Sequence, residues 1–189
     1  MENINIMSNI KELTWEHHKA AERCGFVKIL LSGSIDPKLY ATFLWNQYIK
    51  YTELEKLADK YGLLKGIETV KRKDSIYADF LELWTQKHMP PTFASTHEYI
   101  NHIRQLQNKQ HIFAHIYVHH MGDLSGGQII SKRVPGSGRM YKFLHDTTEL
   151  KDQIRARTTD EMADEAGICF QFAIKQFQEL ENLSIDLTA

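Results

Sequence analysis

The sequence predicts an all-α protein made of one domain. Apolar residues recur at helical spacing along almost the whole chain, and no run of alternating β-branched residues is long enough for a sheet. With 189 residues the chain has the size of one ordinary domain, large enough to enclose a ligand, and neither a repeat nor a linker divides it. We therefore expect a single helical domain over residues 1–189.

Capping and turn signals define the helices of the first half. The first helix should run from about Ser8 to Cys24, with Gly25 as its stop signal. The pair Asp36-Pro37 matches an N-cap followed by proline at the first helical position, and it starts a long helix, rich in aromatic residues, that continues toward Gly62.

Two further helices flank a proline loop. A third helix is expected from roughly Asp74 to Gln86, ending before Pro90-Pro91. The run Ser95-Thr96-His97-Glu98 matches a capping box, in which a hydroxyl and a carboxylate three residues apart accept hydrogen bonds from each other's backbone N–H groups. A fourth helix should therefore begin there.

A bent helix is expected in the second half. From about Lys109 a stripe of apolar residues continues into a glycine-containing stretch and on to Val134, which implies helix on both sides of a bend. Pro135-Gly136-Ser137-Gly138 is the strongest loop signal in the chain. Beyond it we expect a short helix that holds Lys151 and Arg155, and a long final helix from Asp160 to about Leu183.

Charge and cysteine content limit the partners and the compartment. The formal net charge of -1 gives no general attraction to nucleic acid or to a membrane surface. Residues 1–13 lack a secretion signal, and no segment has the roughly 20 apolar residues of a membrane span. Cys24 and Cys169 form no CxxC pair. We expect a cytoplasmic protein, or one of an organelle stroma if a transit peptide has been removed.

The stretch Gly122-Asp123-Leu124-Ser125-Gly126-Gly127 is the strongest functional signal. Each glycine in a helix interior costs about 1 kcal/mol relative to alanine, so the segment should gain something from them. Glycine lets the backbone lie against a flat ligand, and a kink lets the helix cross the ligand's face. From composition alone, a crossing of small residues or a break into a loop is an equal alternative.

Two polar features accompany the glycines. His18 and Glu22 are spaced i, i+4, so a metal-binding imidazole could have a carboxylate within reach of its other ring nitrogen. An ordinary surface pair has the same spacing. Asp123 lies in an apolar segment, where a carboxylate needs water or hydroxyl partners, although an exposed position on the helix would also explain it.

Together these residues resemble the haem oxygenase family. The resemblance rests on His18-Lys19-Ala20-Ala21-Glu22 and on Met121-Gly122-Asp123-Leu124-Ser125-Gly126-Gly127-Gln128, and it extends along nearly the whole chain. It implies a haem held between a proximal helix and a kinked distal helix, with His18 as the iron ligand and Glu22 as its partner. His17 is the rival ligand, and by pattern alone it lies on the more apolar stripe.

The resemblance also implies roles for other side chains. Gly122 and Gly126 crowd the distal face, and Asp123, helped by Tyr51, holds water beside the reacting oxygen. The remaining haem contacts are expected at Ser125, Gly127 and Phe170, and the propionates are expected to meet Lys11, Tyr117, Lys151 and Arg155. That set of propionate contacts implies attack at the α-meso carbon.

The implied reaction opens haem to biliverdin IXα, carbon monoxide and ferrous iron with O2, so haem is both substrate and cofactor. The sequence has neither a Rossmann fingerprint nor a P-loop, and no bound flavin or nicotinamide is expected. Electrons should come from a ferredoxin-type donor, and a bilin reductase could act downstream. An acidic donor would fit basic residues after the bend, although they could equally be a solvated surface: Lys132, Arg133, Arg139 and Lys142.

Two histidines depart from the family's pattern. His119 stands where many members have arginine, and His120 replaces an aromatic residue, so the distal hydrogen-bond network can differ. His111, His115 and His119 also recur every four residues, a spacing that could present imidazoles to a metal, although a polar helix face is the simpler interpretation. A haem carrier or sensor, and a haem-free enzyme on the same scaffold, remain alternatives.

Overall fold

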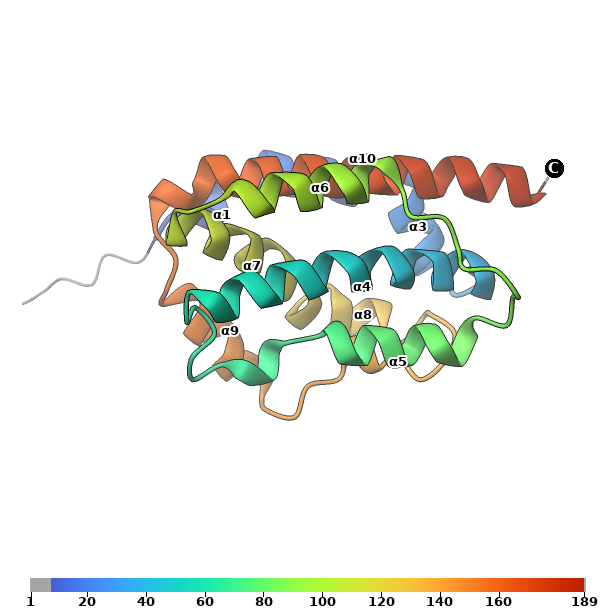
Figure 1. Ribbon diagram of the computed structural model, residues 1–189, viewed down its shortest axis with the longest axis horizontal. Coiled ribbons are helices and arrows are strands. Elements are labelled where there is room, and N and C mark those ends of the chain that lie inside the picture. The colour runs from blue at the N-terminus through green and yellow to red at the C-terminus, as the bar shows by residue number, and fades with distance from the viewer. Residues whose placement is uncertain (1–7, 189) are drawn as a thin grey trace, which may run out of the picture.

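Helices lying along one common axis form the body of the protein in the computed structural model, which describes residues 8–188 (Figure 1). Within that range the regular elements are α-helices or 3₁₀ helices, and none is a strand, which confirms the all-α prediction. Residues 1–7 and 189 lie outside it, so the predicted domain bounds stay predictions. The elements are α1 (Ile10–Leu13), α2 (Trp15–Glu22), α3 (Gly25–Leu31), α4 (Pro37–Lys60), η1 (Glu68–Val70), α5 (Lys73–Leu83), α6 (Ala94–Gln105), α7 (Lys109–Leu124), α8 (Gly127–Ile130), η2 (Arg139–Tyr141), α9 (Thr147–Arg155), η3 (Asp160–Met162) and α10 (Ala163–Thr188).

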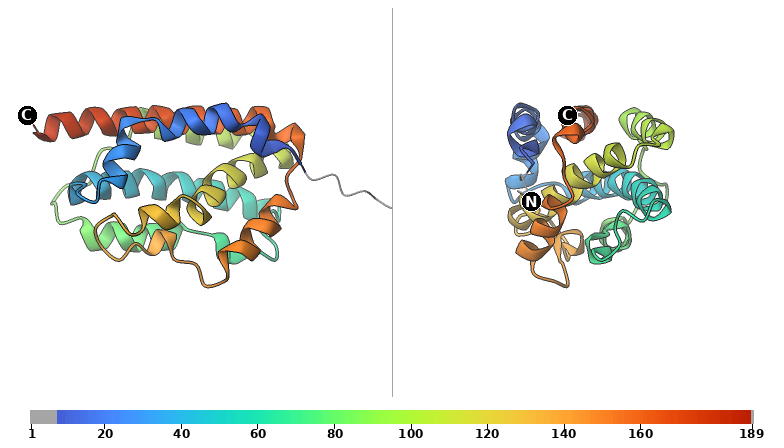
Figure 2. Two further views of the ribbon diagram at one scale, coloured as in Figure 1. Left: turned by 180° about the vertical axis from the view of Figure 1, so that it is seen from behind. Right: turned by 90° about the vertical axis from the view of Figure 1, so that its left-hand side faces the viewer.

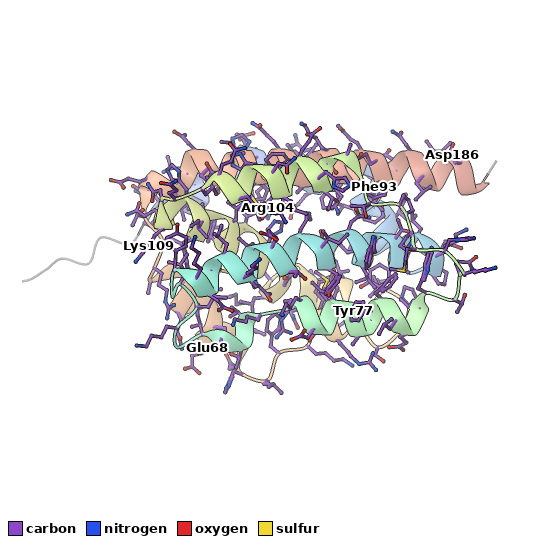
Figure 3. All side chains as sticks on the ribbon, in the orientation of Figure 1. Glu68, Tyr77, Phe93, Arg104, Lys109 and Asp186 are labelled. Atoms are coloured by element: carbon purple, nitrogen blue, oxygen red, sulfur yellow. The ribbon has the colours of Figure 1, made fainter. Side chains whose placement is uncertain are left out.

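The long helices α4 and α10 organise the others. Figure 2 shows α10 running beside α2 on one side and α6 on the other, and α10 also packs against α3 and α7. Helix α4 lies next to α5, α6 and α7, and its inward face buries large side chains such as Tyr40, Leu44 and Leu54. Helix α7 is thus held between α4 and α10. In Figure 3 the long polar side chains, Arg104 and Lys109 among them, project from the outer surface.

The start of α4 is as the sequence predicts. The Asp36 carboxylate accepts hydrogen bonds from the backbone N–H groups of Lys38 and Leu39 at 2.9 and 3.0 Å. Proline 37 occupies the first turn, where its missing N–H leaves no helical bond unmade. This cap fixes the register of the helix that carries Tyr51 into the interior.

The prediction of one continuous first helix is wrong, because the structure has two short helices there. The chain breaks at Thr14, whose hydroxyl donates a 2.7 Å hydrogen bond to the backbone carbonyl of Ile10. Gly25 follows the end of α2 but also begins α3, which the sequence analysis missed. A Cβ at Gly25 would overlap the Glu181 side chain at 2.2 Å, so glycine here allows close packing on α10.

The predicted capping box at the start of α6 does not form. Glu179, from α10, instead accepts hydrogen bonds from the backbone N–H groups of Ala94 and Ser95 at 3.1 and 3.3 Å, and from the Ser95 hydroxyl. Glu98 pairs with Lys175 at 2.7 Å. Both carboxylates are therefore committed to the α6–α10 contact, and a distant residue replaces the local cap.

Helix α5 ends at Leu83, three residues before the expected Gln86. Trp84 adopts extended backbone angles, and its indole N–H donates to the carbonyl of His88 at 3.1 Å, so the chain turns away there. Among the described residues, no helix combines the length and hydropathy needed to cross a membrane.

Candidate functional site

The bend between α7 and α8 is confirmed. Ser125 separates the two helices with backbone angles of φ -112° and ψ -90°. The Gln128 side-chain amide donates to the carbonyl oxygens of Asp123 and Tyr141 at 3.1 and 2.9 Å, so the bend is tied to the following loop. The kink is consequently a fixed feature of the fold with its polar groups satisfied.

The three glycines at the bend have different surroundings. A Cβ added to Gly122 would meet nothing within 4 Å, and one at Gly126 would meet only the Gly122 carbonyl at 3.9 Å. A Cβ at Gly127 would lie 2.5 Å from the Tyr141 ring. Gly122, Ser125 and Gly126 are exposed, whereas Gly127 is buried. The first two glycines leave a strip of backbone with no side chain packed on it, and Gly127 serves packing against Tyr141.

Asp123 points away from that strip into the interior. Its carboxylate accepts a 2.7 Å hydrogen bond from the Tyr51 hydroxyl, and both side chains are buried. Burial raises the pKa of Asp123 to about 7, although His120, Tyr51 and Arg72 each oppose that rise. A carboxyl group with this pKa can both hold and release a proton near neutral pH.

A second buried carboxylate lies behind this pair. Glu55 accepts a 2.6 Å hydrogen bond from the backbone N–H of Arg72, and it lies 3.3 Å from Nε2 of His120. The Arg72 guanidinium donates to the carbonyl oxygens of Thr69, Val70 and Lys142. The sequence analysis missed Glu55 and Arg72, because one lies mid-helix and the other in a basic run without a motif.

His119 and its neighbours form an interior polar group. Burial lowers the pKa of His119 well below its ordinary value, so its imidazole is neutral. Its Nε2 lies 3.5 Å from Sγ of Cys169, and its ring centroid lies 5.3 Å from that of Tyr51. Nearby, the buried Lys50 ammonium donates to Gln176 at 2.6 Å, and burial lowers the pKa of Lys50 to about 8.

On the proximal side, His18 and His17 face different surroundings. Nδ1 of His18 is buried and lies 3.7 Å from the Glu22 carboxylate, while 45% of the side chain is exposed. The ring stacks on Trp15 and meets the edge of Phe170. His17 packs on α10, since a Cβ at Gly167 would lie 2.9 Å from its Nε2. Both side chains are half-buried, but His17 is engaged with α10, whereas His18 lies against Trp15, Phe170 and Glu22.

The proximal and distal segments meet through Tyr117. Burial raises the pKa of Tyr117. The Thr14 side chain, at the break between α1 and α2, and the charge of Arg155 both act to lower the pKa of the Tyr117 hydroxyl. Tyr117 lies little more than one turn before Gly122 on α7. Of the four residues expected to meet the propionates, Tyr117 and Arg155 interact electrostatically, while Lys11 is exposed on α1 and Lys151 is half-buried on α9.

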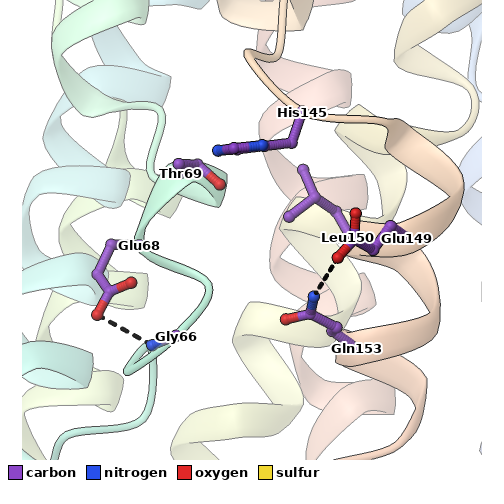
Figure 4. A pocket seen from close by; sticks show the side chains of 7 residues that line it. All are labelled: Gly66, Glu68, Thr69, His145, Glu149, Leu150 and Gln153. Carbon is purple, nitrogen blue, oxygen red and sulfur yellow. Dashed lines mark hydrogen bonds between the residues drawn. The ribbon is translucent and has the colours of Figure 1, made fainter.

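A separate surface pocket lies between η1 and α9 (Figure 4). Its volume is about 190 Å³, and its lining is Gly66, Glu68, Thr69, His145, Glu149, Leu150 and Gln153. That volume is below the roughly 300 Å³ of small ligand pockets. None of the proximal or distal residues lines it, so it is no part of the candidate site.

Comparisons with known proteins agree with this geometry. The family model described as heme oxygenase matches residues 4–179. A heme oxygenase of Guillardia theta is 31% identical over 94% of this chain and 86% of that protein. Heme oxygenase 1 of Synechocystis is 28% identical over 94% of this chain and 85% of that protein.

Solved structures match along the same length. The crystal structure of heme oxygenase-1 from Synechocystis in complex with heme has a TM-score of 0.85 and 26% identity, covering 98% of this chain and 96% of that one. Heme oxygenase from Leptospira interrogans has a TM-score of 0.79 and 27% identity, covering 90% and 97%. The chain belongs to the haem oxygenase family.

Proposed function

We propose that this protein opens haem at the α-meso carbon to biliverdin IXα, carbon monoxide and ferrous iron, using O2 and electrons from a ferredoxin-type protein. The observation that carries the proposal is the buried Tyr51–Asp123 pair directly behind the open backbone of Gly122 and Gly126. A carboxyl group that titrates near neutrality, adjoining a strip fitted to a flat ligand, suits proton-coupled oxidation of that ligand.

His18 is proposed as the iron ligand. The Glu22 carboxylate on the Nδ1 side of its ring would orient the imidazole and raise its basicity, while Phe170 and Trp15 limit its rotation. His17 is engaged with α10, which supports the choice of His18. Haem, when bound, supplies both the iron at which O2 is reduced and the ring carbon that is oxidised.

The distal residues divide the work. Gly122 and Gly126 let the backbone approach the porphyrin closely, with Ser125 exposed between them, and the bend restricts the space for a second ligand on the iron. Asp123, positioned by Tyr51, would hold water and exchange protons with it. Gly127 is proposed as a further haem contact through its position in the bend, with its Hα side packed on Tyr141.

The orientation of haem in the site would decide which ring carbon reacts. Lys11, Tyr117, Lys151 and Arg155 are proposed to hold the propionates, and the charge of Arg155 already acts on the Tyr117 hydroxyl. Arg155 is bonded to Asp152 at 2.8 Å on an exposed surface, a contact weak enough to exchange for a propionate. The attack at the α-meso position follows from this one orientation.

The electron donor would dock on the basic residues after the bend. Lys132, Arg133 and Lys142 offer positive charge to an acidic ferredoxin, and Arg139 is held by Glu82 at 2.7 Å. A bilin reductase is the proposed consumer of the product. Cys24 and Cys169 are both free thiols, which suits a cytoplasmic or stromal protein.

The test adds haem to the purified protein, then ferredoxin, ferredoxin reductase and NADPH in air. Product analysis should give biliverdin IXα and one carbon monoxide per haem. Stable oxygenated haem without ring opening would favour a carrier or sensor instead, and a different biliverdin isomer would refute the proposed propionate contacts alone.

A further inference from the structure

Histidines from two helices converge on one carboxylate away from the haem-binding residues. Nε2 of His102, on α6, and Nε2 of His115, on α7, lie 2.6 and 2.8 Å from the same oxygen of Glu165, on α10. One ligand atom from each of the three residues lies within 4.8 Å of the other two. His111, one turn before His115, places Nδ1 4.0 Å from the other Glu165 oxygen.

We propose that this cluster is a binding site for a divalent transition-metal ion of the Zn²⁺ type, held by His102, His115 and Glu165 with His111 as a fourth ligand. In the sequence, the spacing of His111, His115 and His119 allows a metal site, although a polar helix face is the simpler interpretation. His119 turns inward to Cys169, and His102 and Glu165 take its place from other helices.

The donor set suits such an ion. Imidazole nitrogen and carboxylate oxygen are preferred ligands of Zn²⁺ and related ions. The Glu165 carboxylate, which lies within hydrogen-bond distance of both imidazoles, supplies a negatively charged oxygen ligand. An ion would neutralise that charge and displace the protons of the two hydrogen bonds.

The geometry needs a small adjustment only. Bond lengths near 2.1 Å in a tetrahedral site separate neighbouring ligand atoms by about 3.4 Å, so the two nitrogen–oxygen distances must each widen by roughly 0.6 to 0.8 Å. His115 is fully buried, but the His102 side chain is 29% exposed and His111 is 40% exposed. Those two rings can move, and they leave the ion a route from solvent.

Without an ion, the same residues form a hydrogen-bonded contact between α6, α7 and α10. That simpler role gives no response to added metal. An ion would cross-link the three helices, and the melting temperature would rise with the logarithm of the ion concentration above the dissociation constant, because the ion binds the folded chain. A metal site and a simple helix contact therefore differ in how the melting temperature responds to added metal, which can be measured without haem and without turnover.

The experiment uses the untagged, haem-free chain. Zn²⁺ binding is measured by calorimetry and thermal unfolding, and Co²⁺ is added to detect the visible absorption of a tetrahedral nitrogen–oxygen site. We expect one ion per chain. His102→Gln should weaken binding by about tenfold or more, since its exposed ring can be replaced without disturbing the core.

Two matched variants complete the design. His97→Gln removes an exposed imidazole from the same helix, and His18→Ala removes an imidazole–carboxylate pair on α2; both variants should bind Zn²⁺ like the parent chain. The proposal is overturned if Zn²⁺ does not saturate at one ion, or if His102→Gln binds as tightly as the parent. Either result leaves haem cleavage untouched.

Discussion

The Tyr51 hydroxyl is 2.7 Å from the Asp123 carboxylate, and after the charge of His120 its hydrogen bond is the next largest influence that opposes the effect of burial on the pKa of that carboxyl group. Tyr51→Phe removes the donor, so the pKa of Asp123 should rise further above 7. The loss of a hydrogen bond to a buried carboxyl group should also lower the free energy of unfolding by about 1 to 3 kcal/mol. Infrared titration of the protonated carboxyl stretch measures the pKa shift directly.

Tyr99→Phe is the matched control for that variant. Tyr99 is equally buried, but its hydroxyl has no hydrogen-bond partner among the described residues. Its removal should leave the Asp123 titration unchanged and should not lower stability. If both phenylalanine variants shift the titration equally, the hydrogen bond is not the cause.

Asp123 should make the haem-free protein less stable as the pH rises. Its pKa is about 7 in the folded chain against an ordinary 3.8, so the folded state binds the extra proton between those values. The free energy of unfolding contributed by this group is therefore highest below pH 4 and falls as the pH approaches 7, by at most about 4 kcal/mol at 1.4 kcal/mol per unit. Urea denaturation of the parent and Asp123→Asn at pH 5 and pH 8 tests this. The variant's advantage should grow with pH, and parallel curves would contradict the assignment.

Substitutions of Gly122 and Gly127 at the bend should affect haem binding and folding differently. Gly122→Leu places its side chain in open space, so the haem-free chain should stay folded while haem affinity falls at least tenfold, roughly the effect of 1.4 kcal/mol. Gly127→Ala pushes a methyl group into Tyr141 and should lower the melting temperature. Haem titration and thermal unfolding of both variants distinguish the two roles, and the reverse pattern would exchange them.

Substitutions of His18 and His17 should likewise have different effects on haem ligation and on stability. His18→Ala should abolish the histidine-ligated haem spectrum with little change in stability of the haem-free chain, because half of its side chain is already exposed. His17→Ala should retain the spectrum and loosen the contact with Gly167. Absorption spectra of both haem complexes decide the matter, and a normal spectrum in His18→Ala would move the ligand to His17.

Lys50 should destabilise the chain at neutral pH. Its pKa falls from 10.5 to about 8 because of burial, so the unfolded chain binds more protons between those values and stability rises with pH across that window. Lys50→Met should therefore add about 1 to 2 kcal/mol at pH 7, after loss of the hydrogen bond to Gln176. The gain should shrink at pH 10. Lys56→Met, an exposed change on the same helix, should show neither effect.

Local patterns predicted the helices well where the signal and its partner are close in sequence. Asp36 caps α4 through N–H groups two and three residues away, and the glycine bend lies where the apolar stripe crosses it. The capping box failed because Glu179, 84 positions beyond Ser95, competes for the same N–H group. A rule based on neighbouring residues cannot predict a hydrogen bond to a residue so distant in sequence.

Only the part of the candidate site that lies in local sequence motifs could be predicted. The motifs supplied Asp123, Gly122 and His18, but the buried partners Glu55 and Arg72 have no spacing signature because they approach through the fold. Whether a glycine faces open space or a tyrosine ring is likewise a tertiary fact.

Helix α10 carries Glu165 and Gly167 only two residues apart, one in the histidine cluster and the other beneath His17. A rigid helix transmits a shift at one of these positions to the other. If an ion at Glu165 alters how tightly the chain takes up haem, thermodynamic reciprocity requires haem to alter the affinity for the ion by the same factor. The final helix would then couple haem binding at one position to metal-ion binding two residues away.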